Sequence, residues 1–71
     1  MCIASVRSMT HAIKAKKALE NNDINAEIIR LEPHMTKNGC GFGVQFSCVN
    51  LYNAKDALDR KYIKYSEILD I

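Results

Sequence analysis

The chain has 71 residues, of which 48% are hydrophobic and 25% are charged, and its formal net charge is +2. This length allows one domain with a thin core, and the composition is that of a globular protein and not of a disordered one. The small net charge gives no indication of a nucleic-acid partner, and no apolar run approaches the ~20 residues of a membrane span. The first residues lack the basic start and long apolar stretch of a signal peptide. We therefore expect a single cytoplasmic domain over residues 1–71, with no membrane partner.

The first half of the chain predicts a strand, a helix and a second strand. Residues 1–7 are mostly apolar and compatible with a strand, and Ser8 or Thr10 can cap a helix over residues 10–21 that is rich in Ala, Lys and Leu. The following Asn-Asn-Asp run ends this helix, since Asn tolerates the left-handed conformation. The β-branched content of residues 24–31 predicts a strand that Pro33 closes, and residues 34–41 are expected to form a loop.

The second half repeats this order. Residues 42–49 alternate between apolar and small or polar side chains, which predicts a half-buried strand. Asn50 or Asn53 can cap a helix to about residue 61, and residues 63–69 are expected to form the last strand. The expected shared core consists of Phe42, Val44, Phe46, Ala12, Leu19, Ala54 and Leu58.

An internal repeat supports this organisation. Five residues recur at an offset of 39 positions: Ala15, Lys16, Ala18, Leu19 and Ile24 return as Ala54, Lys55, Ala57, Leu58 and Ile63. Two strand-helix-strand halves in one sheet predict an α+β fold, the ferredoxin-like β-α-β-β-α-β sandwich. Its four-stranded antiparallel sheet has the strand order 4-1-3-2 and carries both helices on one face.

Three cysteines, Cys2, Cys40 and Cys48, are spread over the chain. A small secreted scaffold usually carries an even and denser set, so we expect free thiols in a reducing compartment. Cysteines and histidines do not have the spacing of a zinc site, and we expect neither a metal nor a cofactor. By the alternation of the third strand, Cys48 is expected to be a small core residue. Cys2 is expected to lie at a fraying end.

All three glycines lie within residues 39–43, around Cys40. Glycine is used where a side chain does not fit, so this segment is either a hairpin loop with a bulge or a site where Gly39 and Gly41 leave one thiol accessible. In the expected topology, Cys40 lies near Arg7, Ser8, Thr10, His11 and the first turn of the first helix. Cations and a helix N-terminus lower the pKa of a thiol, so Lys37, Arg7 and His11 are expected to favour a reactive thiolate at Cys40.

The same region carries a family resemblance. Thr10-His11-Ala12 with Leu19, then Ile24, Pro33 and the Cys40-Gly41 pair, resemble the selenium/sulfur (Se/S) carrier protein-like family over roughly residues 3–68. The Cys-Gly pair is the signature of that family. Members often have Arg after the proline, Ser within the loop and Glu in the first helix, where this chain has His34, Lys37 and Lys16. The resemblance implies a small sulfur or selenium carrier.

A carrier function gives Cys40 a specific role. Its thiol would accept sulfane sulfur as a persulfide from a donor such as a cysteine desulfurase and pass it to an acceptor protein. The chain would then be the thiol relay partner of an enzyme and not an enzyme by itself.

Two other functions stay open. An RNA-recognition module shares the element order, but Val44 stands where its third-strand motif has an aromatic residue, and Phe42 is expected to face the helices. A small ligand-binding or protein-interaction module would use the glycine segment only as structure. In that case Gly41, Gly43, Gln45 and Ser47 would form a flat face suited to a homodimer.

Overall fold

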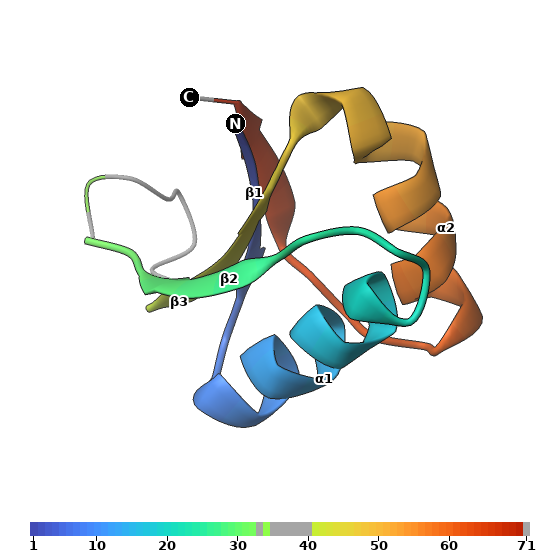
Figure 1. Cartoon of the computed structure of the whole chain (residues 1–71). Helices are drawn as coiled ribbons and strands as arrows, with labels where there is room; N and C mark the ends of the chain where they lie inside the picture. The colour runs from blue at the N-terminus through green and yellow to red at the C-terminus, as the bar shows by residue number, and fades with distance from the viewer. Residues whose placement is uncertain (33, 35–40, 71) are drawn as a thin grey trace.

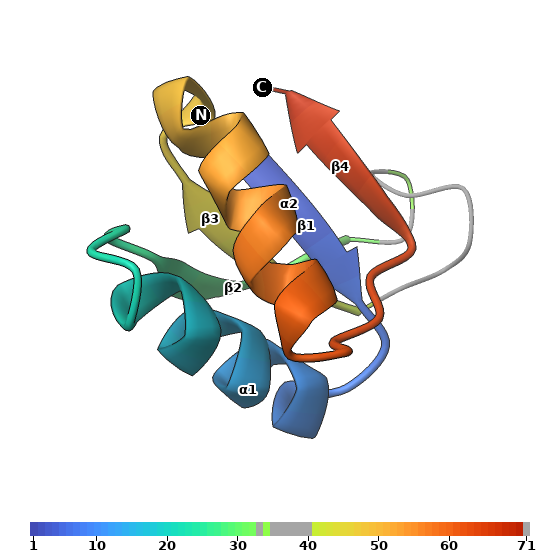
Figure 2. The ribbon, with the colours of Figure 1, turned by 90° about the vertical axis from the view of Figure 1, so that its right-hand side faces the viewer.

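A four-stranded antiparallel sheet carries two helices on one face in the computed structural model, which describes residues 1–32, 34 and 41–70 (Figures 1 and 2). The elements are β1 (Cys2–Val6), α1 (Met9–Glu20), β2 (Glu27–Arg30), β3 (Phe42–Phe46), the 3₁₀ turn η2 (Cys48–Asn50), α2 (Leu51–Arg60) and β4 (Glu67–Asp70). The strand order is β2-β3-β1-β4, which reads 4-1-3-2 from the β4 edge. The predicted α+β class is confirmed. No helix among these residues is long and apolar enough to cross a membrane.

The end of α1 shows a Schellman-type cap. Asp23 adopts a left-handed conformation with φ 61°, and the backbone N–H of Ile24 donates to the carbonyl of Leu19 at 3.0 Å. The sequence analysis expected an Asn of this run to adopt the left-handed conformation, but Asn21 is right-handed with φ −64°. The left-handed residue is instead Asp23, the last residue of the Asn-Asn-Asp run, and the turn directs Ile24 back into the core.

The end of α2 repeats this geometry at the offset of the sequence repeat. Tyr62, which lies 39 residues after Asp23, has φ 54°. The N–H of Ile63 donates to the carbonyl of Leu58 at 3.0 Å, as in the first half. The internal repeat is therefore a structural one, and it extends to the turn that follows each helix.

The core lies between the sheet and the helices. The antiparallel register of β1 and β3 pairs Cys2 with Phe46, Ala4 with Val44 and Val6 with Phe42. These side chains point toward the helices. The small alanines of both helices allow close approach to the sheet. All of the expected core residues belong to this core or pack against it, as predicted: Phe42, Val44, Phe46, Ala12, Leu19, Ala54 and Leu58.

The strands are shorter than the sequence predicted. β2 begins at Glu27, because residues 24–26 connect the helix layer to the sheet, with Ile24 and Ala26 buried on the way. β3 ends at Phe46, because the chain turns at Ser47 into η2. β4 begins at Glu67 for the same reason as β2, since the residues after Ile63 cross to the sheet. Alternation and β-branched content do not distinguish such connections from strands.

Gly43 lies on the sheet face opposite the helices, beneath two apolar side chains. A Cβ at this position would lie 2.5 Å from Cγ2 of Ile3 and 3.1 Å from Cδ1 of Leu31. Both side chains are buried. Gly43 is therefore required by packing, whereas a Cβ at Gly41 meets nothing within 4 Å among the described atoms.

Candidate functional site

The expected site falls partly inside the described structure. Cys40, Gly39 and Lys37 lie outside the described residues, whereas Gly41, Arg7 and His11 are within them. The carbonyl of Gly41 accepts a hydrogen bond of 2.9 Å from the N–H of Leu31, which holds the start of β3 against the end of β2.

The start of β3 also lies against the end of β1. Phe42, the first residue of β3, pairs with Val6, the last residue of β1. Gly41 directly precedes β3 and Arg7 directly follows β1, so both lie just beyond this pair. Gly41 therefore lies at the end of the sheet where Arg7 and the start of α1 lie.

Arg7 and His11 line one cleft at this end of the sheet. The cleft has a volume of about 540 Å³, and its other lining residues are Lys64, Tyr65 and Ser66. The backbone N–H of Ser66 donates to the carbonyl of Ser5 at 2.8 Å, which brings the segment before β4 beside the end of β1. The cleft thus brings the basic side chains of Arg7 and Lys64 and the imidazole of His11 together.

The start of α1 forms one wall of the cleft. Ser8 caps this helix, and its hydroxyl accepts a hydrogen bond of 3.3 Å from the backbone N–H of His11. The same hydroxyl lies 2.7 Å from Nδ1 of the His11 ring, which fixes the orientation of the imidazole. A helix N-terminus carries a partial positive charge, so the helix adds to the positive potential of Arg7 and Lys64.

Tyr65 is a neutral donor in this cleft. Burial, and secondarily the negative charge of Asp59, raise the pKa of its phenol above the ordinary value of 10.0. The hydroxyl is therefore protonated at neutral pH. No acidic side chain is among the residues that line the cleft, so its described surface is suited to an anion.

The sequence analysis missed the contribution of residues 64–66. They had been assigned to the last strand, whose pairing partner was known from the expected strand order. An antiparallel strand beside β1 must begin where β1 ends, so their position next to Arg7 followed from the expected strand order.

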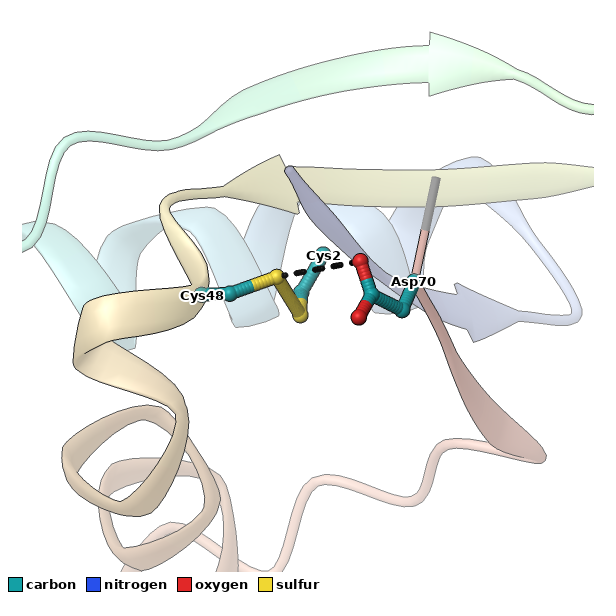
Figure 3. Close-up of side chains that lie close together, drawn as sticks. All are labelled: Cys2, Cys48 and Asp70. Carbon is teal, nitrogen blue, oxygen red and sulfur yellow. Dashed lines mark hydrogen bonds between the residues drawn. A yellow bond between two sulfur atoms is a disulfide. The ribbon is translucent and has the colours of Figure 1, made fainter.

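A second cluster lies at the opposite end of the sheet, where Cys2 and Cys48 form a disulfide (Figure 3). Their sulfur atoms are 2.12 Å apart and their Cα atoms 5.0 Å apart. Sγ of Cys48 also lies 3.6 Å from Oδ1 of Asp70. The expectation of free thiols at these two positions is therefore wrong.

Both cysteines also differ from their expected environments. Cys2 is not at a frayed end, because β1 pairs it with Phe46 on one side and Asp70 on the other, and it is only 3% exposed. Cys48 belongs to η2 and not to β3, and it packs against the edge of the core. The turn at Ser47 into η2 brings Cys48 next to Cys2, so that their Cα atoms lie within the range that a disulfide spans.

The two clusters are well separated. Cys2 begins β1 and Val6 ends it, so four steps of about 3.3 Å place their Cα atoms roughly 13 Å apart. The disulfide is therefore not part of the cleft beside Arg7.

The sequence matches the model of a protein family along almost its whole length. Residues 1–70 match the model of the family described as "Putative Se/S carrier protein-like". No curated protein and no solved structure matches the chain.

Proposed function

Because the chain belongs to the Se/S carrier protein-like family, we propose that this ferredoxin-like sandwich is a sulfur or selenium carrier that holds the transferred atom on Cys40. The family match over residues 1–70 is the observation that carries the proposal. The pair Cys40-Gly41, the signature of that family, lies within the matched range.

The disulfide supports the choice of Cys40 among the three cysteines. Cys2 and Cys48 are bonded to each other, so neither offers a thiol in this state. Cys40 is the one remaining cysteine of the sequence. A carrier thiol must be a thiolate to attack a sulfane sulfur, and it must be reachable by a partner protein.

The charge at this end of the sheet also supports the proposal. Gly41, the sequence neighbour of Cys40, is held at the start of β3 by the hydrogen bond from Leu31. Arg7 and Lys64 line the cleft beyond the neighbouring end of β1. Cations and a helix N-terminus stabilise a thiolate or persulfide anion more than the neutral thiol.

The proposed transfer needs no oxidant. The Cys40 thiolate attacks the terminal sulfur of a persulfide on the donor, a cysteine desulfurase. The new bond joins Sγ of Cys40 to that sulfur, the sulfur–sulfur bond of the donor breaks, and the donor leaves as a thiolate. An acceptor protein's thiolate then repeats the exchange at the loaded Cys40. For a selenium carrier, the terminal atom is selenium instead of sulfur, and the same bonds to that atom form and break.

Intact-mass measurement after incubation with a cysteine desulfurase and cysteine tests this function. The unmodified chain should gain the mass of one sulfur atom, and Cys40→Ser should gain none. A double variant, Cys2→Ser with Cys48→Ser, is the matched control and should load as the unmodified chain does. A sulfur adduct retained in Cys40→Ser would overturn the proposal.

A structural role for the glycine segment is the second candidate, favoured by the packing of Gly43 beneath Ile3 and Leu31. On this alternative the chain is a ligand-binding or protein-interaction module, with homodimerisation through the sheet as one form. It predicts that Cys40→Ser leaves function and assembly unchanged, so the same variant distinguishes the two candidates.

A further inference from the structure

The disulfide and its neighbouring carboxylate bring three potential metal ligands together. Sγ of Cys2, Sγ of Cys48 and a carboxylate oxygen of Asp70 all lie within 4.8 Å of one another (Figure 3). They come from β1, η2 and β4, so the tertiary structure and not a local motif assembles them. We propose that reduction of this disulfide creates a binding site for Zn²⁺, with two thiolates and Asp70 as ligands. The site does not use Cys40 and is separate from the carrier function.

The distances suit a tetrahedral ion. Zn–S bonds of about 2.3 Å and Zn–O bonds of about 2.0 Å place a sulfur and an oxygen ligand roughly 3.5 Å apart. Sγ of Cys48 and Oδ1 of Asp70 are already 3.6 Å apart. Two sulfur ligands of one zinc ion lie roughly 3.8 Å apart. Once the covalent bond is broken, rotation of the two side chains can bring the sulfurs of Cys2 and Cys48 to this separation.

The donor set selects the class of metal. Two thiolates and one carboxylate suit Zn²⁺, whereas Mg²⁺ and Ca²⁺ prefer oxygen ligands alone. Three protein ligands leave the fourth tetrahedral position for water. Cys2 is buried, Cys48 is partly buried and Asp70 is exposed, so an ion reaches the site from the Asp70 side.

The change of state balances in electrons and protons. A dithiol reductant gives two electrons and two protons to the Cys2–Cys48 bond and becomes a disulfide itself, which leaves two thiols in the protein. Zn²⁺ then displaces both thiol protons into solvent. The two links are alternatives, since either the disulfide or the metal ties the start of β1 to the turn that begins α2.

Co²⁺ binding to a Cys40→Ser variant tests the site without interference from the third cysteine. The protein is reduced with a trialkylphosphine, which gives two electrons to the disulfide and becomes phosphine oxide, while one water molecule supplies the oxygen and the two thiol protons. Reduced protein should bind one Co²⁺ with tetrahedral d–d bands and thiolate-to-cobalt charge transfer, and Zn²⁺ should displace it. Unreduced protein should show neither spectrum.

Two aspartate variants separate a specific site from non-specific binding. Asp70→Asn should weaken Co²⁺ binding by about tenfold or more, since the loss of a ligand costs at least as much as the loss of its hydrogen-bonding support. Asp56→Asn is the matched control, because its carboxylate pairs with Arg60 at 3.0 Å, and its affinity should not change. Circular dichroism of the reduced protein should show a folded chain with Zn²⁺ present. Absence of tetrahedral Co²⁺ spectra, equal affinity of the two variants, or a reduced chain that Zn²⁺ leaves unfolded would each overturn the proposal.

Discussion

Gly43→Ala is expected to destabilise the fold by crowding the sheet face opposite the helices. The added Cβ would lie 2.5 Å from Cγ2 of Ile3, closer than real Cβ contacts, and 3.1 Å from Cδ1 of Leu31. Leu31 can rotate its terminal methyl group aside. Ile3 is β-branched and fully buried, so its Cγ2 cannot move without shifting χ1 or the backbone of β1.

The cost follows from two opposing terms. Overpacking a well-packed site typically costs about 1–3 kcal/mol. Replacing a strand glycine with alanine recovers roughly 0.5–1 kcal/mol of backbone entropy. From the middle of each range, the free energy of unfolding should fall by roughly 1 kcal/mol, which corresponds to a decrease in Tm of about 4–8 °C for a domain of this size.

Urea and thermal unfolding, followed by circular dichroism, measure this change. Gly41→Ala is the matched control, because its Cβ meets no described atom within 4 Å, and it should stay within about 0.5 kcal/mol of the unmodified protein. In an Ile3→Ala background, Gly43→Ala should cost less, because the atom it meets is gone. Equal stability of the two glycine variants, or an unchanged cost in the Ile3→Ala background, would refute the packing explanation.

Three further predictions concern the core, the disulfide and the cleft. Leu19→Ala and Leu58→Ala should each lower the free energy of unfolding by about 2–5 kcal/mol in urea titrations, since both side chains are fully buried, while Val49→Ala, at an 88% exposed position, should have no measurable effect. Reducing the disulfide in the presence of a chelator should lower stability by about 2–4 kcal/mol, because its ends are 46 residues apart in sequence; unchanged urea midpoints would contradict this. The phenol of Tyr65 should titrate above 10.0, measured as the difference in ultraviolet absorbance from Tyr65→Phe, and Asp59→Asn should lower its pKa. The unfolded state loses this proton first, so stability should fall as pH rises past about 10.

Local patterns predicted most of the fold. The helical spacing of the alanines and of Leu19 and Leu58 identified the buried faces, and the 39-residue repeat identified two equivalent halves. The strand bounds were less well predicted, because residues such as Ile24 are buried while they connect layers. Periodicity reports burial and does not report whether a backbone is paired.

The cleft could be predicted in part from the sequence. Arg7 and His11 lie close together because they are four residues apart, at the end of β1 and the start of α1, and the pairing of β4 with β1 brings Lys64 beside them. The disulfide was missed because an odd number of cysteines was taken to indicate free thiols. The pairing of Cys2 with Cys48 depends on the turn at Ser47, which the expected strand over residues 42–49 did not include.

Locating the transferred sulfur in the unmodified chain tests the carrier function most directly. The protein is loaded with a cysteine desulfurase and cysteine, its persulfide is blocked by alkylation, and it is digested without reduction. Cleavage after Phe42 and after Phe46 places Cys40 and Cys48 on different peptides, so tandem mass spectrometry assigns the extra sulfur to one residue. The carrier function predicts it on Cys40, with Cys2 and Cys48 still joined. Sulfur found on either of those two, or on no cysteine at all, would contradict it.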